Sequence, residues 1–235
     1  MGLLGLLLLG VAGFRHFRSP PALDRNPPAV TATATFALGC FWGPEARLAA
    51  LPGVVRTRVG YCGGSTANPD YFHLGDHSEA VQVEFDPVRL SYPQLLQEAR
   101  QLGDFGSPVR KRQYRSAVFT HDSQQAQLAR QQGLAEVEPA GRFYLAEDSH
   151  QKYYLQQQVT LMRELRSRFA DFRSFNDSTS AALGNAMAAG VLPRPQVEQL
   201  LPGLEFSAPA QQLLLRRAEE PLPPGCGVRP MSHPP

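Results

Sequence analysis

The sequence contains few cysteines and no strong charge imbalance. Only Cys40, Cys62 and Cys226 stand among its 235 residues. No two of them form a Cys-x-x-Cys pair, so we expect neither a closed zinc site nor a disulfide-rich scaffold. The 23 basic and 21 acidic residues give a formal net charge of +2. Because the sequence has no strong excess of positive charge, we predict no nucleic-acid partner.

Long hydrophobic runs are missing except at the N terminus. The apolar run over residues 1–13 is shorter than a membrane span and has the length of a signal-peptide core. Arg15 and Arg18 follow it, a pattern that also fits a mitochondrial transit peptide or a membrane-tethered form. We therefore predict entry into the secretory pathway or the extracellular space, with the mitochondrion as the alternative. We expect no stable membrane span in the mature chain.

The composition is that of a globular protein, with 43% hydrophobic and 19% charged residues. We predict a leader with a Pro-rich linker over residues 1–29 and one folded domain over 30–171. A helical extension should follow over 172–220. Residues 221–235 contain six prolines and should form a flexible tail. We expect a monomer.

The pattern of the folded part alternates between strands and helices. Residues 80–85 alternate strictly, with Val81, Val83 and Phe85 on one face of a half-buried strand. We predict further strands at 31–38, 54–61, 114–119 and 141–145, and helices at 44–51, 91–102, 123–135 and about 148–169. This order predicts an α+β fold, a ferredoxin-like two-layer sandwich in which helices cover a mixed sheet.

Cys40 lies where a predicted strand ends and a predicted helix begins. Backbone N–H groups at a helix N terminus stabilise a thiolate and lower the pKa of a thiol. Gly39 and Gly43 allow a tight turn there, and Phe41 and Trp42 can form an apolar wall. A buried structural cysteine beside core aromatics is the alternative.

A second group of candidate residues surrounds the alternating strand. Glu79 starts that strand, whose inward face is apolar, so poor solvation should raise the pKa of its carboxyl and keep a proton available. Tyr71 and Tyr114 offer two phenolic donors. A thiolate, a protonated carboxyl and two phenols suit attack on an electrophile whose oxygen is protonated as it leaves. Individually, a surface glutamate and two core tyrosines are the simpler interpretation.

Five short motifs occur in order between about residues 30 and 155. They are Gly-Cys-Phe-Trp-Gly at 39–43 with Glu45, Val-Gly-Tyr-Cys-Gly-Gly at 59–64 with Asn68-Pro69-x-Tyr71, His77-x-Glu79 with the strand to Pro87, Gln-Tyr-Arg-Ser at 113–116, and Ala-Glu-Asp-x-His-Gln-x-Tyr at 146–153. Together they resemble the A class of peptide methionine sulfoxide reductases.

This resemblance implies an α+β core and a role for each candidate residue. Cys40 would be the nucleophile on the sulfoxide sulfur, and Glu79 would donate a proton to the sulfoxide oxygen. Tyr71 and Tyr114 would hydrogen-bond that oxygen. Phe41 and Trp42 would be the substrate-binding residues that contact the terminal methyl group. The substrates would be the S epimer of methionine sulfoxide, free or in oxidised proteins and peptides. The products would be methionine and a Cys40 sulfenic acid.

A second thiol must then reduce the sulfenic acid. The family's usual glycine-rich tail with recycling cysteines is replaced here by the helical extension and a single Cys226. We consider Cys226 the candidate resolving thiol, with an unpaired tail cysteine as the alternative. Cys62 is expected to be structural, with resolution of Cys40 as a minor alternative. We expect no bound cofactor and no metal, and an external reductant that is a thioredoxin-like protein or a small dithiol.

Two competing functions remain to be compared with the reductase. A catalytically silent binder of oxidised methionine would need a lost active-site residue, and none is lost. A cysteine hydrolase would need a histidine paired with Cys40, for which His77 and His150 are the candidates. The reductase uses neither as a base, so pH dependence and peptide-cleavage assays separate the two.

Overall fold

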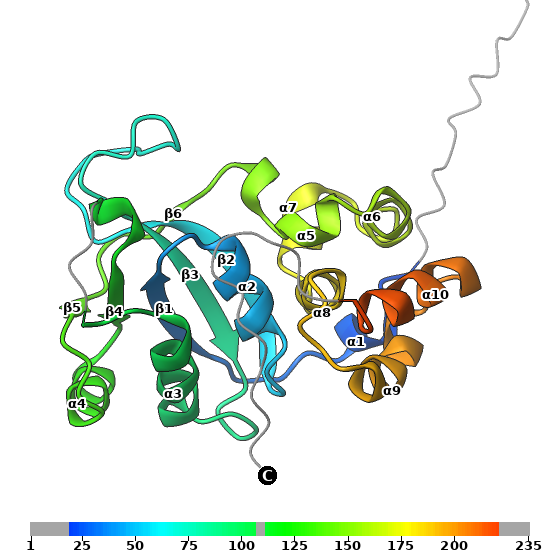
Figure 1. Cartoon of the computed structure of the whole chain (residues 1–235), viewed down its shortest axis with the longest axis horizontal. Helices are drawn as coiled ribbons and strands as arrows, with labels where there is room; N and C mark the ends of the chain where they lie inside the picture. Colours follow the sequence, from blue (N-terminus) through cyan, green and yellow to red (C-terminus); the bar gives the residue numbers. More distant parts are fainter. Residues whose placement is uncertain (1–18, 107–110, 221–235) are drawn as a thin grey trace, which may run out of the picture.

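A six-stranded mixed sheet forms the first layer of the computed structural model, which describes residues 19–106 and 111–220 (Figure 1). The strand order is β5-β4-β1-β3-β2-β6. Neighbouring strands are antiparallel except β4 and β5, which are parallel. The strands are β1 (Ala32–Leu38), β2 (Val54–Cys62), β3 (Ser78–Phe85), β4 (Ser116–Thr120), β5 (Val137–Pro139) and β6 (Tyr144–Leu145).

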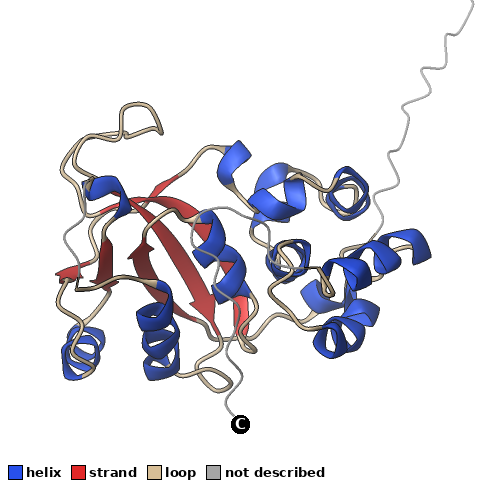
Figure 2. Ribbon diagram, viewed as in Figure 1, coloured by secondary structure: helices blue, strands red, loops and turns tan. Residues whose placement is uncertain are grey.

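Three helices form the second layer on one face of this sheet: α2 (Trp42–Ala49), α3 (Tyr92–Leu102) and α4 (Ser123–Gln131) (Figures 1 and 2). Phe36, Val83 and Leu96 lie in the apolar core between the layers and are fully buried. The order β4-β1-β3-β2, with α2 joining β1 to β2 and α3 joining β3 to β4, is that of a ferredoxin-like sandwich. The predicted α+β fold is therefore confirmed.

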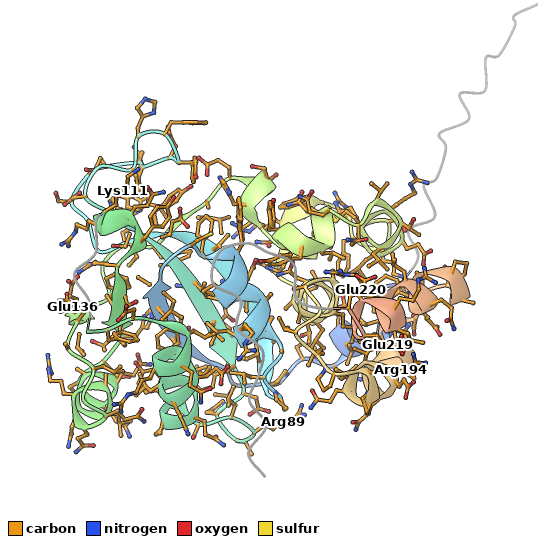
Figure 3. All side chains as sticks on the ribbon, viewed as in Figure 1. Arg89, Lys111, Glu136, Arg194, Glu219 and Glu220 are labelled. Carbon is orange, nitrogen blue, oxygen red and sulfur yellow. The ribbon has the colours of Figure 1, made fainter. Side chains whose placement is uncertain are left out.

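The predicted helical C-terminal part is also confirmed, and it lies beside the sheet next to α2 (Figure 2). Its core includes Ala46 and Ala49 of α2 as well as Leu155, so the two parts share one apolar cluster. Figure 3 shows Arg194 and Glu219, which form a surface ion pair within this part. Helices α5 (Tyr153–Gln156) and α6 (Val159–Arg166) lead into the predicted extension over 172–220 and pack with it. The extension itself contains α7 (Phe172–Asn176), α8 (Thr179–Ala188), α9 (Arg194–Leu204) and α10 (Ala208–Arg217).

A short N-terminal helix, α1 (Ala22–Arg25), packs on α8 and α9. Asp24 caps the start of α8, because its Oδ1 accepts a hydrogen bond from the Thr179 N–H at 2.7 Å. Residues 1–18 of the predicted leader and the predicted tail over 221–235 lie outside the described residues. Within the described ranges, no helix has the length and apolar character needed to cross a membrane.

The single long helix predicted over residues 148–169 is wrong. The chain instead forms a 3₁₀ helix, η2 (Asp148–His150), followed by α5 and α6. Lys152 breaks the helix because its backbone is left-handed, with φ of 50° and ψ of 47°. Helical periodicity in the sequence continues through this point, so only tertiary contacts account for the break.

Two smaller differences concern the sheet. Tyr114, predicted at the start of a strand, lies in the 3₁₀ helix η1 (Arg112–Tyr114), and β4 begins only at Ser116. The strand β5 was not predicted, because three residues are too few for a period-two pattern to be visible. It depends on its parallel pairing with β4.

A buried ion pair accounts for the conformation of Lys152. The side chains of Lys152 and Glu45 are both fully buried, and Lys152 Nζ donates to Glu45 Oε1 at 2.8 Å. Nζ also donates to the Thr57 carbonyl oxygen at 2.7 Å and to Asn176 Oδ1 at 2.9 Å. The Lys152 backbone N–H donates to Glu45 Oε2 at 3.0 Å. Each ammonium proton has an acceptor, which is the condition for burying a charge without a large penalty.

We predict that Lys152→Met lowers the free energy of unfolding by about 3–5 kcal/mol, because Glu45 is then a buried carboxylate without its counter-ion. Chemical denaturation followed by circular dichroism measures the loss. Lys111→Met is the matched control, because Lys111 is an exposed lysine at the sheet end of the molecule (Figure 3). The double variant Glu45→Gln/Lys152→Met should regain part of the loss. A loss below about 1 kcal/mol, the usual value for an exposed pair, would show that the ion pair between Lys152 and Glu45 contributes little to stability.

Candidate active site

Cys40 occupies the turn between β1 and α2, where the sequence places it. Gly39 precedes it with φ of +79°, a left-handed conformation that a glycine adopts without strain. The Gly39 N–H donates to the Arg115 carbonyl oxygen at 3.4 Å, which ties this turn to the segment before β4. Cys40 is partly exposed and comes two residues before the first residue of α2. The N-terminal N–H groups of α2 therefore favour a thiolate at this position.

Glu79 lies next to this turn, with its carboxyl almost completely buried (1% exposed). Its Oε2 accepts a hydrogen bond from the Phe41 N–H at 3.1 Å, and its Oε1 accepts one from Gln113 Nε2 at 2.8 Å. Burial raises the pKa of Glu79, while the two hydrogen bonds oppose the rise. Phe41 directly follows Cys40, so the hydrogen bond places a weakly acidic carboxyl beside Cys40. Both the position and the raised pKa agree with the sequence-based expectation.

Tyr71 and Tyr114 come from distant segments and meet at the site. Tyr71 lies in the loop between β2 and β3, and Tyr114 ends η1. Their side chains share a hydrogen bond. Burial, this hydrogen bond and the charge of Glu79 raise the pKa of Tyr114 to about 12, so its hydroxyl stays protonated at neutral pH. The structure thus brings together the four residues that the sequence singled out for proton donation and nucleophilic attack.

The aromatic side chains beside Cys40 form one wall. Trp42 stacks on Tyr153 with ring centroids 3.8 Å apart and an interplanar angle of 6°. Trp42 also stacks on His150, with ring centroids 5.8 Å apart. The centroid of the His150 ring lies 5.4 Å from that of Phe41 and 4.8 Å from that of Tyr71. These rings provide an apolar surface that suits a small alkyl group.

The wall contains two unpartnered polar atoms. Among the residues that the structure describes, Trp42 Nε1 and His150 Nδ1 are buried without a hydrogen-bond partner. Buried polar atoms in native proteins usually have partners, and exceptions occur where a molecule binds. Burial also lowers the pKa of His150, which favours the neutral imidazole, although Glu147 opposes this shift.

Glu147 was not assigned a role from the sequence, but it supports the site. Its Oε2 accepts a hydrogen bond from the Tyr61 hydroxyl at 2.7 Å, and its Oε1 accepts one from the Tyr71 N–H at 2.9 Å. It therefore fixes the loop that carries Tyr71. Gln113, the partner of Glu79, was likewise missed. Both residues lie within the motifs quoted above, and this was the one feature of the sequence that could have pointed to a role for them.

His77, the first histidine considered as a hydrolase base, is fully engaged elsewhere. Its Nδ1 accepts from the Gly64 N–H at 3.1 Å, and its Nε2 contacts the Thr66 carbonyl oxygen at 2.8 Å. These contacts use both ring nitrogens to hold the loop after β2. His77 therefore has no free nitrogen with which to activate Cys40.

Of the other two cysteines, only Cys62 is among the described residues, and it lies away from the site. Cys62 is a free thiol, 1% exposed, in the small apolar cluster on the sheet face opposite Phe41. Burial raises its pKa, which makes it a poor nucleophile. Cys226, the candidate resolving thiol, lies outside the described residues. Over the described ranges, no group of three or more His, Cys, Asp or Glu side chains could hold a metal ion.

Comparisons with known proteins give the same assignment as the site geometry. The family model for peptide methionine sulfoxide reductase matches residues 32–179. Peptide methionine sulfoxide reductase A5 of Oryza sativa subsp. japonica is 38% identical over 203 residues, which cover 79% of each chain. The Drosophila melanogaster peptide methionine sulfoxide reductase is 41% identical over 150 residues, covering 58% of this chain and 60% of that protein.

A solved structure agrees with the fold. Methionine sulfoxide reductase A of Corynebacterium diphtheriae superposes with a TM-score of 0.50 at 32% sequence identity, covering 60% of this chain and 85% of that one. The matched range, residues 32–179, contains Cys40, Glu79, Tyr71 and Tyr114, the residues that converge at the site. The chain therefore belongs to the peptide methionine sulfoxide reductase family, in its A class.

Proposed function

We propose that Cys40 reduces the S epimer of methionine sulfoxide, free or in proteins, by direct attack on the sulfoxide sulfur. As a member of its family, the protein is an oxidoreductase that returns methionine sulfoxide to methionine and so repairs oxidised proteins. The observation that carries the residue assignment is the hydrogen bond from the Phe41 N–H to Glu79, which holds a buried carboxyl beside the nucleophile.

The Cys40 thiolate forms a bond to the sulfoxide sulfur, and Glu79 donates its proton to the sulfoxide oxygen. After a second protonation this oxygen leaves as water, and the Cys40 sulfur stays bonded to the substrate sulfur in a sulfonium. A water molecule then attacks the Cys40 sulfur and breaks the sulfur–sulfur bond, which releases methionine and a proton and leaves a sulfenic acid on Cys40. In sum, a thiol and a sulfoxide become a sulfenic acid and a thioether, so the sulfur of Cys40 is oxidised as the substrate is reduced.

The remaining site residues orient the substrate. Tyr71 and Tyr114 share a hydrogen bond near Glu79 and can donate to the sulfoxide oxygen while negative charge develops on it. Phe41 and Trp42 bind the terminal methyl group against the aromatic wall. Restricting both the methyl group and the oxygen leaves one configuration at sulfur, which is the physical basis of selectivity between epimers.

The sulfenic acid is removed by a second thiol. Cys226 attacks the Cys40 sulfenic acid, forming a disulfide and releasing water, and an external dithiol then reduces the disulfide. Support for Cys226 is that Cys62 is buried on the opposite face of the sheet, with a raised pKa. The external reductant is a thioredoxin-like protein or a small dithiol.

The two competing functions have less support. A silent binder would have lost part of the site, whereas Cys40, Glu79 and both tyrosines are present and converge. A hydrolase would need a basic histidine at Cys40, but His77 is engaged in the loop. His150 lies 3.8 Å from Glu147 Oε2, but its ring packs between Phe41 and Trp42, and burial lowers its pKa and so weakens it as a base.

The compartment and the assembly state are further proposals. The apolar run over residues 1–13 supports entry into the secretory pathway, with the mitochondrion as the alternative. A single chain contains all the residues of the proposed site, so the reaction needs no second subunit, in keeping with a monomer.

We predict that the reduced protein consumes only the S epimer of a methionine sulfoxide peptide in a single turnover, and that Cys40→Ser consumes neither epimer. Chromatography of the two separated epimers measures consumption, and mass spectrometry of the protein locates the oxidised cysteine. Cys62→Ser is the matched control, because it changes another thiol outside the site. Turnover by Cys40→Ser, or equal consumption of both epimers, would refute the assignment.

We predict that Glu79→Gln lowers the rate of the reductive step by about 10²–10⁴-fold, because glutamine cannot donate the proton. Since burial raises the pKa of Glu79 above its usual value, the wild-type rate should fall as the pH rises through that raised pKa and the donor is lost. The variant should lack this fall. Single-turnover rates measured as a function of pH test both points.

Glu84→Gln provides the control for Glu79, because Glu84 lies on the same strand and pairs with Arg56 and Arg58 away from the site. It should keep the wild-type rate and pH profile. If Glu79→Gln retained a similar rate and the same pH-dependent fall, another group would be the proton donor.

We predict that Cys226→Ser completes one turnover at the wild-type rate but stops when a thioredoxin-like protein is the reductant. A small dithiol should restore multiple turnovers, because it can reach the Cys40 sulfenic acid directly. Steady-state assays with each reductant measure the difference. Full multiple-turnover activity of Cys226→Ser with a thioredoxin system would exclude the resolving role.

A further inference from the structure

The buried ion pair beneath the active site takes two of its partners from the C-terminal helices. Asn176, at the end of α7, accepts a hydrogen bond from Lys152 Nζ at 2.9 Å and is 2% exposed. Asn185, in α8, is fully buried, accepts a hydrogen bond from the Leu155 N–H at 3.1 Å and lies 3.5 Å from Glu45 Oε2. Polar side chains from these helices therefore complete a network whose carboxylate belongs to α2.

Glu45 connects this network to the nucleophile's helix. It lies in the first turn of α2, and its N–H donates to the Phe41 carbonyl oxygen at 2.9 Å. Its Oε1 also accepts a hydrogen bond from Thr57 Oγ1 at 3.1 Å. The carboxylate is thus fixed to both α2 and β2, and it provides a rigid reference point for Lys152.

The contacts of Lys152 with Glu45 hold its backbone in a left-handed conformation. Its φ of 50° is uncommon for a residue with a side chain and costs about 1–2 kcal/mol. Two contacts with Glu45, one from the backbone N–H and one from Nζ, hold the residue in this conformation. Strained residues of this kind persist where the surrounding contacts determine them, and they are frequent at functional sites.

The residues on either side of Lys152 contact the sole tryptophan of the chain. Tyr153 stacks on Trp42 at 3.8 Å, and His150 stacks on its indole at 5.8 Å. Rotation of the Lys152 backbone to an ordinary helical conformation would change the relative directions of these two rings. The left-handed turn is therefore what lets one short segment present both rings to Trp42.

We propose that Asn176 and Lys152 are positioning residues, through which the C-terminal helices hold the Trp42–His150–Tyr153 wall in the geometry that binds the substrate methyl group. Asn176 fixes the ammonium group, the ammonium group and Glu45 fix the Lys152 backbone, and that backbone orients the two rings. The kinetic part of this inference rests on the proposed function, whereas the geometry of the wall does not.

Asn176→Ala is the test variant, because it removes one acceptor of Nζ without touching the aromatic wall. Because Trp42 is the sole tryptophan, its fluorescence reports this wall alone. We expect a shifted emission maximum, greater quenching by acrylamide and a KM for methionine sulfoxide raised by about tenfold, at the low end of what a methyl contact in an apolar pocket contributes. The kcat should change by less than about threefold, since the proton donor is unaffected.

Two further variants separate positioning from general loosening. Asn176→Asp keeps an oxygen acceptor at Nζ and should restore both the fluorescence and the KM. Leu204→Ala removes a fully buried side chain of α9, in the same C-terminal part but outside the network. It should lower the unfolding temperature at least as much as Asn176→Ala does, yet leave Trp42 emission and the KM unchanged below that temperature.

Each outcome decides the inference. Unchanged emission and KM in folded Asn176→Ala would overturn it, and so would equal changes in Leu204→Ala, because the effect would then be one of stability. If the wild-type protein reduced no sulfoxide, the proposed function would fail, but the fluorescence of the three variants would still test the positioning of the wall.

Discussion

The ion pair between Glu45 and Lys152 is the constraint on which the arrangement of the site depends. Neither side chain is exposed, so each charge is stable only while its partners stay in place. Those partners belong to α2, β2, α7 and the turn before α5. No one of these elements can move by more than a hydrogen-bond length without leaving a charge unpaired in the interior. The pair therefore fixes the start of α2, which follows Cys40, relative to the segment that carries His150.

The chemistry of the site depends on a second constraint: among the described residues, no cation forms an ion pair with Glu79. The guanidinium of Arg115 donates to Ser78 Oγ, beside Glu79 in the chain, but its ion pair is with Glu138. The hydrogen bonds to Glu79 come from neutral donors, the Phe41 N–H and the Gln113 amide. Burial therefore outweighs these bonds and raises the pKa of the carboxyl. A protonated Glu79 can lie beside a Cys40 thiolate without charge repulsion, whereas an ionised carboxylate at the same place would repel it.

The sequence was sufficient for the elements and residues whose signals are local. Strict alternation identified β3, and a glycine before Cys40 with a proline in the first turn of α2 identified the strand-to-helix turn of the nucleophile. The break at Lys152 could not be found in this way, because it depends on Glu45, which lies 107 positions earlier in the chain. The same holds for Glu147 and Gln113, whose roles follow from contacts with Tyr71 and Glu79. The motifs contained these residues, but only the fold shows what each one contacts.

The helical C-terminal part belongs to the same core as the catalytic residues. Every residue of α2 from Gly43 to Ala49 is buried, and a helix buried on all sides must pack against two layers. One of these layers is the sheet, through Leu48, and the other is α8, through Ala46 and Ala49. The matched family model ends at residue 179, at the start of α8. The helix that begins beside Cys40 is thus completed by residues beyond the matched region, and the C-terminal part is a structural component of the active site rather than an attached module.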